Sequence, residues 1–350
     1  MSNHQTFQLR LFKDTDLTSV NRLFTSVFGI KRSAAAWHWK FQENPHGKSI
    51  ILLAFSDHDL IGHYALIPRK INLFGSLKNA YQEVDLMINS KYSAGGVFRK
   101  MGKHIYNIAG EQDCPFTFGF PNQTSLPAGK RILGWRAIGS IPLFTLLLNP
   151  IDFLKNKFSN QEINKNHYSI PDKIYHRIIS LRFRSRKKTN QIKIFDNQTV
   201  RLLQNINRGK NFYFEREEEY LNWRYFNHPD KNYLIVCSGP DPEPEGVAIF
   251  CHSDHQTQIA EFELKYSEDY ETAKALMMAI YSDALKRQSF AIRMWMLESD
   301  PYVSMLHSLG FSPRDSKIHH VIRSFMDPES NRLIWDPERW YISSGDSDCV

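Results

Sequence analysis

The chain of 350 residues has few of the features that mark disulfide-bonded, zinc-binding or membrane-spanning proteins. Its four cysteines, Cys114, Cys237, Cys251 and Cys349, show no CxxC spacing, so we expect reduced thiols and no metal site. The nearest candidate for a membrane span, residues 141–148, is too short to cross a bilayer. With 42% hydrophobic and 13% aromatic residues, the composition is that of a folded globular protein.

The sequence also lacks, at its start, the basic and then apolar pattern of a secretory signal, so we expect a cytoplasmic protein. Positive charge is in excess: the formal net charge of +7 favours an anionic partner, whether nucleotide, nucleic acid or lipid headgroup. Much of this charge lies in a basic cluster at residues 182–188. A hydrated linker surface explains such a cluster, and RNA or an anionic membrane are the alternatives. Aromatic residues are sparse there, which argues against a groove for single-stranded nucleic acid.

The two halves of the chain repeat one pattern. Trp39 and Trp223 each begin a segment that reaches a proline six residues later, and Gly62 and Gly246 each follow the tryptophan by 23 residues. Each half then has an acidic strand, a helix, another strand and a Leu-Gly-aromatic corner, at 133–135 and 309–311. Two copies of one αβ unit are the simplest interpretation.

The acidic strand of the first copy, residues 81–88, alternates regularly. Alternation predicts that Glu83, Asp85 and Met87 share one face of the strand. Residues 93–98 then form a Gly-containing turn that opens a helix over 96–110. Helix N-terminal amides in such a turn bind phosphate, and glycine lets the ligand approach closely. The matching turn of the second copy, residues 267–271, is acidic and would repel a phosphate, so the first copy has the better candidate site.

These features resemble the GNAT acyltransferase superfamily, and more closely its bacterial tandem members found near polysaccharide genes. In that family a Leu-x-Val-x-Pro strand leads into Tyr-Arg-Gly-x-Gly-x-Phe, whose amides hold the pyrophosphate of acetyl-CoA. The corresponding segments here are 86–90 and 92–98. Three positions depart from the pattern: Ser90 replaces proline, Ser93 stands in place of Arg or Gln, and Ala94 replaces glycine.

The resemblance implies an α/β (α+β) fold of tandem GNAT-like domains, each with a mixed, mostly antiparallel central sheet flanked by helices. The N-terminal domain, with the acyl-CoA site, is expected at 1–150, and a basic, partly helical linker at 151–190. The C-terminal domain, with a degenerate CoA loop, is expected at 191–326, and an aromatic tail that docks onto a domain at 327–350. The last strand of the C-terminal domain is expected at 319–325, within the second copy.

The resemblance also implies where acetyl-CoA would bind. Backbone groups of Leu86, Met87 and Ile88 would pair with the pantetheine arm, and Asn122 would contact that arm, although a helix N-cap explains Asn122 equally well. The residues of the phosphate loop are Ser93, Ala94, Gly95, Gly96, Val97 and Phe98. No metal is implied.

A carboxylate near the thioester is the natural base for an amine nucleophile, and Glu83 and Asp85 are the candidates. Hydrogen bonding to loop amides or a polar rim would explain both equally well. His63 and Tyr64 lie on the strand that lines the acceptor groove in this family. The tyrosine that often protonates the leaving thiolate is replaced by Lys130 in the first copy, so solvent or another side chain would take that role.

The function implied is transfer of an acetyl group from CoA directly to a small-molecule amine in the N-terminal domain. The family analogy favours an amino sugar of a surface polysaccharide as the acceptor. One alternative is a FemX-type transferase that takes an amino acid from tRNA, which suits the basic cluster. The other is a non-catalytic binding or scaffold protein, which suits the missing tyrosine and arginine. The sequence does not determine the oligomeric state.

Overall fold

The computed structural model describes residues 6–92, 96–149, 170–204 and 210–348. Their contacts divide the chain into two compact units. Unit 1 contains the described residues up to Ser140, with Asn227–Asp230 and Lys317–Trp340, and unit 2 contains the described remainder. The units are therefore interleaved along the chain, whereas the sequence analysis expected consecutive domains.

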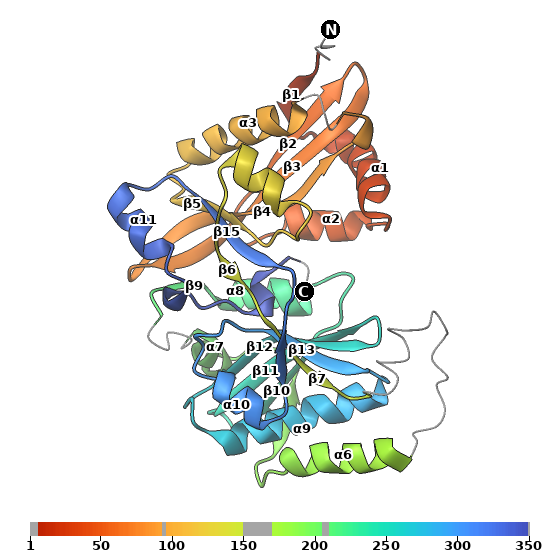
Figure 1. Cartoon of the computed structure of the whole chain (residues 1–350), viewed down its shortest axis with the longest axis vertical. Coiled ribbons are helices and arrows are strands. Elements are labelled where there is room, and N and C mark those ends of the chain that lie inside the picture. Colours follow the sequence, from red (N-terminus) through yellow and green to blue (C-terminus); the bar gives the residue numbers. More distant parts are fainter. Residues whose placement is uncertain (1–5, 93–95, 150–169, 205–209, 349–350) are drawn as a thin grey trace. The chain divides into compact units, whose positions relative to one another are not determined.

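Unit 1 is a sheet with helices on both faces (Figure 1). Its elements are β1 (Gln8–Leu11), η1 (Asp14–Asp16), α1 (Leu17–Phe28), α2 (Ala34–Phe41), β2 (Ile50–Ser56), β3 (Asp59–Leu73), β4 (Ser76–Ile88), η2 (Ser90–Tyr92), α3 (Val97–Glu111), β5 (Phe116–Gly119), α4 (Leu126–Ala128), η3 (Gly129–Leu133), β6 (Arg136–Ser140), β15 (His319–Ser324), α11 (Pro328–Ile334) and η5 (Pro337–Arg339).

Unit 2 is built on the same plan. Its elements are β7 (Leu143–Leu147), α6 (Ile170–Arg182), β8 (Thr189–Ile192), α7 (Asn197–Gln204), β9 (Phe212–Phe214), α8 (Glu218–Leu221), η4 (Asn222–Phe226), β10 (Leu234–Ser238), β11 (Gly246–Ser253), β12 (Gln256–Leu264), α9 (Tyr270–Lys286), β13 (Ala291–Trp295), α10 (Val303–Ser308), β14 (Ser312–Arg314) and η6 (Ser344–Asp346).

The two sheets have matching strand orders. Unit 1 runs β1-β2-β3-β4-β5-β15-β6 and unit 2 runs β8-β10-β11-β12-β13-β7-β14. In each sheet one central pair is parallel, β4 with β5 and β12 with β13, and the other neighbouring pairs on this path are antiparallel. The mixed, mostly antiparallel sheets flanked by helices confirm the predicted fold class, and the matching orders agree with the repeat.

The copies exchange one strand each. The strand β15 from the end of the chain pairs with β5 and β6 in the first sheet, and β7, which follows β6 directly, pairs with β13 and β14 in the second. The prediction that 319–325 closes the second copy is therefore wrong. Alternation of apolar and polar residues predicts a strand but not the strand with which it pairs. Here the pairing strand lies about 200 residues away in the sequence.

Hydrophobic cores lie on both faces of the first sheet. On one face α3 packs Met101 and Ile105 against Leu52 and Leu66. On the other face α1 and α2 contribute a second cluster that includes Trp37 and Val84 of β4. The sheet is thus buried on two sides, which explains its nearly continuous apolar strands.

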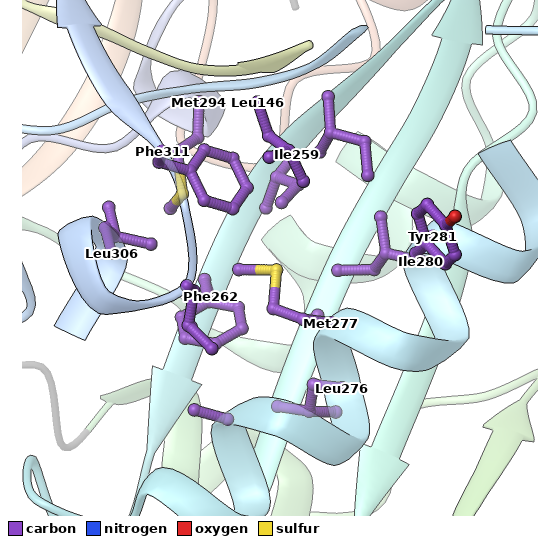
Figure 2. Close-up of a cluster of buried hydrophobic side chains, with 14 of the residues drawn as sticks. Leu146, Ile259, Phe262, Leu276, Met277, Ile280, Tyr281, Met294, Leu306 and Phe311 are labelled. Atoms are coloured by element: carbon purple, nitrogen blue, oxygen red, sulfur yellow. The ribbon is translucent and has the colours of Figure 1, made fainter. Parts of the chain in front are cut away.

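The main core of unit 2 forms where α9 packs on its sheet. Figure 2 shows Met277 and Ile280 of α9 beside Ile259 and Phe262 of β12, with Phe311 closing the cluster. These side chains are all buried, so this face of α9 belongs to the core.

The segment expected as a linker is partly built into unit 2. Residues 150–169 lie outside the described part of the chain, but α6 buries Ile179 and Phe183 in the unit 2 core. The aromatic tail divides between the units: Ile334 and Trp340 are buried in unit 1, and Tyr341 is buried in unit 2.

Candidate functional site

The candidate site lies where β4 and β5 separate. These parallel strands pair only at Tyr81–Thr117 and Gln82–Phe118, although β4 continues to Ile88. Within the described residues, the stretch of β4 after Gln82 has no partner on its β5 side. Open backbone groups in the middle of a sheet are a place where an extended ligand can add as a strand.

A β-bulge in β4 decides which way the two carboxylates point. His63 of β3 pairs with Met87 and Ala65 pairs with Val84, so Asp85 and Leu86 together lie opposite one residue of β3. The bulge residue Asp85 has φ of 47°, a left-handed conformation that breaks the alternation. Side chains beyond the bulge are therefore shifted by one place relative to a regular strand.

The predicted shared face of Glu83, Asp85 and Met87 is wrong for this reason. Glu83 contacts Tyr106 on α3, on one face of the sheet, whereas Asp85 contacts Lys40 on α2, on the other. Val84, which precedes the bulge, lies in the core under α1 and α2, and the shift places Leu86 on the α3 side instead of beside Val84.

Glu83 is held by four different donors. Its carboxylate accepts hydrogen bonds from the hydroxyls of Tyr64, Tyr106 (3.1 Å) and Thr117 (2.5 Å) and from Nε1 of Trp135 (2.8 Å). These donors come from β3, α3, β5 and the Leu-Gly-aromatic corner, so the site exists only in the folded unit. Burial raises the pKa of Glu83 to about 7, although the hydrogen bonds from Thr117, Tyr64, Tyr106 and Trp135 act to lower it. A carboxyl group with that pKa can both accept and release a proton near neutral pH.

Asp85 sits in the opposite electrostatic setting. Its side chain is 8% exposed and pairs with the guanidinium of Arg32 and, at 2.9 Å, with Nζ of Lys40. Burial alone would raise its pKa, but the charges of Lys40 and Arg32 outweigh burial and hold the pKa of Asp85 well below its usual range. Asp85 therefore stays ionised and is committed to two cations, which makes it a poor proton acceptor.

His63 and Tyr64 are both fully buried, but they lie on opposite faces of β3. Tyr64 faces α3, where its hydroxyl lies 2.9 Å from that of Tyr106. His63 faces α2: its Nδ1 donates to the backbone oxygen of Asp85 (2.7 Å), and its Nε2 is buried with no hydrogen-bond partner among the described residues. Burial lowers the pKa of His63 to about 4, so the imidazole is neutral at physiological pH.

The start of α3 matches the predicted phosphate turn as far as the structure describes it. Ser93, Ala94 and Gly95 lie outside the described residues. Gly96 has φ of 74° and precedes the first helical residue, and no side chain caps the helix there. A Cβ at Gly96 would meet no atom of the described residues within 4 Å. Val97 is buried beneath this turn and Phe98 is half-buried against the same core.

The corresponding places in unit 2 are filled by the protein's own groups. Asp269 caps α9 by accepting from the Thr272 amide, and Nζ of Lys187 binds the Asp269 carboxylate at 2.7 Å. Where β12 and β13 separate, Oγ of Ser344 accepts from Nε2 of Gln258 (2.9 Å) and from the amide of Trp295 (2.7 Å). The second copy thus satisfies internally the groups that are open in the first.

Asn122 serves the local loop. Its side-chain oxygen accepts from the amides of Thr124 (3.0 Å) and Ser125 (3.1 Å). These bonds order the loop before α4, whose N-cap is Ser125 and not Asn122, and the contact to the CoA arm stays a prediction.

Sequence reasoning missed the residues that surround the two carboxylates. Tyr106 follows the core residue Ile105 on α3, so its place in the sequence suggests packing only. Trp135 stands out in the sequence only as part of the Leu-Gly-aromatic corner. No local signal links Arg32 or Lys40 to a strand 45 or more residues away. A carboxylate that is buried needs hydrogen-bond donors or cations around it. This general rule is the only signal in the sequence, and it does not say which residues supply them.

A family comparison matches the N-terminal part of the chain. Residues 8–138 match the family model described as an acetyltransferase (GNAT) domain. This part of the chain is therefore similar to GNAT acetyltransferase domains.

The fold of the whole chain is similar to that of several solved structures. One is a conserved protein of unknown function from Enterococcus faecalis, described as a probable N-acyltransferase (14% identity, TM-score 0.64, 91% of this chain and 72% of that one). Another is a GCN5-related N-acetyltransferase from Anabaena variabilis (14% identity, TM-score 0.62, 91% and 73%). A third is the N-myristoyltransferase of Saccharomyces cerevisiae with bound myristoyl-CoA (10% identity, TM-score 0.61, 92% and 79%). At these identities the likeness concerns the fold, and no curated protein sequence matches the chain significantly.

Two further searches bear on the site. Among the described residues, no group of three or more His, Cys, Asp or Glu side chains is placed to hold a metal ion. No helix in the described part of the chain is long and apolar enough to cross a bilayer.

Proposed function

We propose that the GNAT-like domain transfers an acyl group, acetyl by the family resemblance, from a CoA thioester directly to an amine. The observation that carries this proposal is Glu83, a half-buried carboxylate with a pKa near 7 at the point where β4 and β5 separate. The family match supports acyl transfer in general, and this geometry supports a base in the GNAT-like domain.

In the proposed reaction, Glu83 accepts a proton from the amine as the nitrogen attacks the thioester carbon. The C–N bond forms, the C–S bond breaks, and the electron pair leaves with sulfur as a thiolate, which takes a proton from water. The position of the family tyrosine holds Lys130 here, so no tyrosine at that place supplies the proton. Tyr64 and Tyr106 position Glu83 through their hydroxyls.

The acyl-CoA would use groups that the fold leaves open. The backbone of Leu86, Met87 and Ile88 follows the last pair with β5, and an added strand would satisfy it. The uncapped amides at the start of α3 and the dipole of that helix suit a pyrophosphate. Arg99 and Lys100 are exposed on the first turn and add positive charge there.

The acceptor is proposed to be a small-molecule amine, and an amino sugar is the acceptor that the family resemblance favours. His63 stays a predicted acceptor contact, because its neutral Nε2 can accept a hydrogen bond. Its face of the sheet differs from that of Glu83, so we assign it no part in the transfer of the amine proton.

Calorimetry of the full chain with acetyl-CoA tests the proposal. Intact protein should bind saturably, and Gly96→Glu should abolish binding by placing a carboxylate before the α3 amides. Gly75→Glu is a matched control, since Gly75 is also left-handed (φ 79°) with no atom within 4 Å of a Cβ, but lies in the β3–β4 hairpin. Absence of saturable binding by the intact protein would overturn the proposal.

Turnover separates the proposal from its alternatives. Release of free CoA thiol with a panel of primary amines supports acyl transfer. Binding of acetyl-CoA without turnover on any amine favours the non-catalytic alternative, and salt-sensitive tRNA binding in place of CoA binding favours the FemX-type transferase.

A further inference from the structure

The outer face of α6 exposes a line of large apolar side chains. Ile174, Ile178 and Leu181 are 57%, 46% and 58% exposed. Their spacing of four and three residues places them on one face of the helix. None of them belongs to a hydrophobic cluster of the described residues. We call these three residues the α6 stripe.

The stripe cannot turn inward, because the other side of α6 is anchored. Ile179 and Phe183 are buried in the core of unit 2, and the Tyr175 hydroxyl donates to the backbone oxygen of Leu147 at 2.7 Å. Figure 1 shows α6 alongside α9, and the His176 ring lies 2.9 Å from the Tyr281 hydroxyl of that helix. The α6 stripe therefore stays on the surface of the folded unit.

Arginines border the stripe on both sides. Arg177 precedes Ile178 and Arg182 follows Leu181, so helical geometry places one on each flank. Both are exposed, and the Arg182 guanidinium lies against Gly310 of unit 2. The positive charge continues beyond the helix, and between Ile174 and Phe195 the chain contains no Asp or Glu. The exposed basic residues that follow are Arg184, Arg186, Lys188 and Lys193.

We propose that this face of α6 docks on an anionic lipid surface. Ile and Leu side chains of such a stripe can enter the boundary between headgroups and acyl chains, while flanking arginines extend to lipid phosphates. A basic segment directly after the helix adds attraction to anionic headgroups. The inference stands on unit 2 and is independent of the acyl transfer proposed for the GNAT-like domain.

A lipid surface fits this face better than RNA does. Proteins that bind single-stranded RNA place aromatic rings beside their basic groups, because bases stack on them. On the outer face of α6 the exposed apolar side chains are aliphatic, which suits acyl chains and offers no stacking platform.

Vesicle flotation with the full chain tests the proposal. The protein should float with vesicles of phosphatidylcholine mixed with phosphatidylglycerol and not with phosphatidylcholine alone. Substituting the stripe (Ile174→Ser, Ile178→Ser, Leu181→Ser) should weaken binding at least about tenfold, and Arg177→Gln with Arg182→Gln should do the same.

Matched variants elsewhere on the surface serve as controls. Ile30→Ser with Leu77→Ser removes apolar residues of similar exposure (61% and 50%), and Arg22→Gln with Lys78→Gln removes two exposed cations. Neither control should change flotation. Circular dichroism melting shows whether the stripe variant is folded.

A second measurement reports contact of the α6 stripe with lipid directly and does not require a variant that loses its fold or its binding. Tryptophan fluorescence of an Ile178→Trp variant should shift to the blue with the mixed vesicles, whereas Ile30→Trp should not. The proposal is overturned if the intact protein does not float with the mixed vesicles, if it binds tRNA and not vesicles, or if the folded stripe variant binds as tightly as the parent. Equal binding by the folded stripe variant would mean that the protein adsorbs to the vesicles through its positive charge alone.

Discussion

Glu83 and Asp85 lie two residues apart on β4, yet their side chains emerge on opposite faces of the sheet. The bulge at Asp85 separates them and places them in contrasting electrostatic surroundings. Burial among uncharged groups raises the pKa of Glu83 to about 7 despite its hydrogen-bond donors, while two cations hold Asp85 ionised. One strand thus presents a carboxyl group with a raised pKa on one face and a carboxylate paired with two cations on the other.

The first prediction concerns the proposed base. Glu83→Gln keeps the size of the side chain but removes the proton acceptor, so kcat for acyl transfer should fall roughly 100- to 10,000-fold. The KM for acetyl-CoA should change little, because the proposed CoA contacts come from backbone groups of β4 and α3. Steady-state kinetics measures both. A kcat within about threefold of the parent would exclude Glu83 as the base.

The second prediction is a pH dependence of folding. Burial raises the pKa of Glu83 from the ordinary value of 4.5 to about 7, so the folded protein holds this proton more tightly than the unfolded chain. The contribution to the free energy of unfolding is therefore full below about pH 4.5 and is lost as the pH rises to about 7, by at most about 3 kcal/mol. Denaturant unfolding of the parent and of Glu83→Gln over this range measures it: the stability of the parent relative to the variant should decline. A constant difference between them would contradict the prediction.

The third prediction concerns the ion pairs of Asp85. Asp85→Asn leaves the cations of Arg32 and Lys40 without their buried counter-charge, and should lower the free energy of unfolding by about 3–5 kcal/mol. Arg10→Gln is the comparison, because its pair with Asp16 is more exposed (37% for Arg10) and should cost less. Equal losses in the two variants would show that the burial of the Asp85 cluster has no special weight.

The fourth prediction tests how Trp135 positions Glu83. A Cβ at Gly129 would lie 1.8 Å from the Trp135 ring, so Gly129→Ala must displace the indole that donates to Glu83. Overpacking should cost about 1–3 kcal/mol. Loss of a donor to the carboxylate should also raise the pKa of Glu83 and move the activity profile to higher pH.

Gly110→Ala is the control for that variant. Gly110 lies on α3 with no atom within 4 Å of a Cβ, so alanine there should stabilise the helix slightly and leave the profile unchanged. An equal shift of the pH–activity profile in both variants would show that Trp135 does not position Glu83.

Local pattern predicted the elements of the site but not their geometry. The helix expected over 96–110 is α3, Val97–Glu111, and the acidic strand expected over 81–88 is the end of β4. The faces of that strand were wrong after Val84, because one left-handed residue inserts a bulge that regular alternation does not reveal.

The sequence by itself determined the repeat marked by Trp39 and Trp223 and the positions of the acidic strand and of the helix after it. These follow from short-range periodicity, which depends on neighbours along the chain, whereas the fold class came from the family resemblance. Only the tertiary structure decided that β15 completes the first sheet and that Glu83, not Asp85, has the pKa of a base. Both depend on contacts between residues far apart in the sequence, and strand pairing and burial arise only when such residues meet.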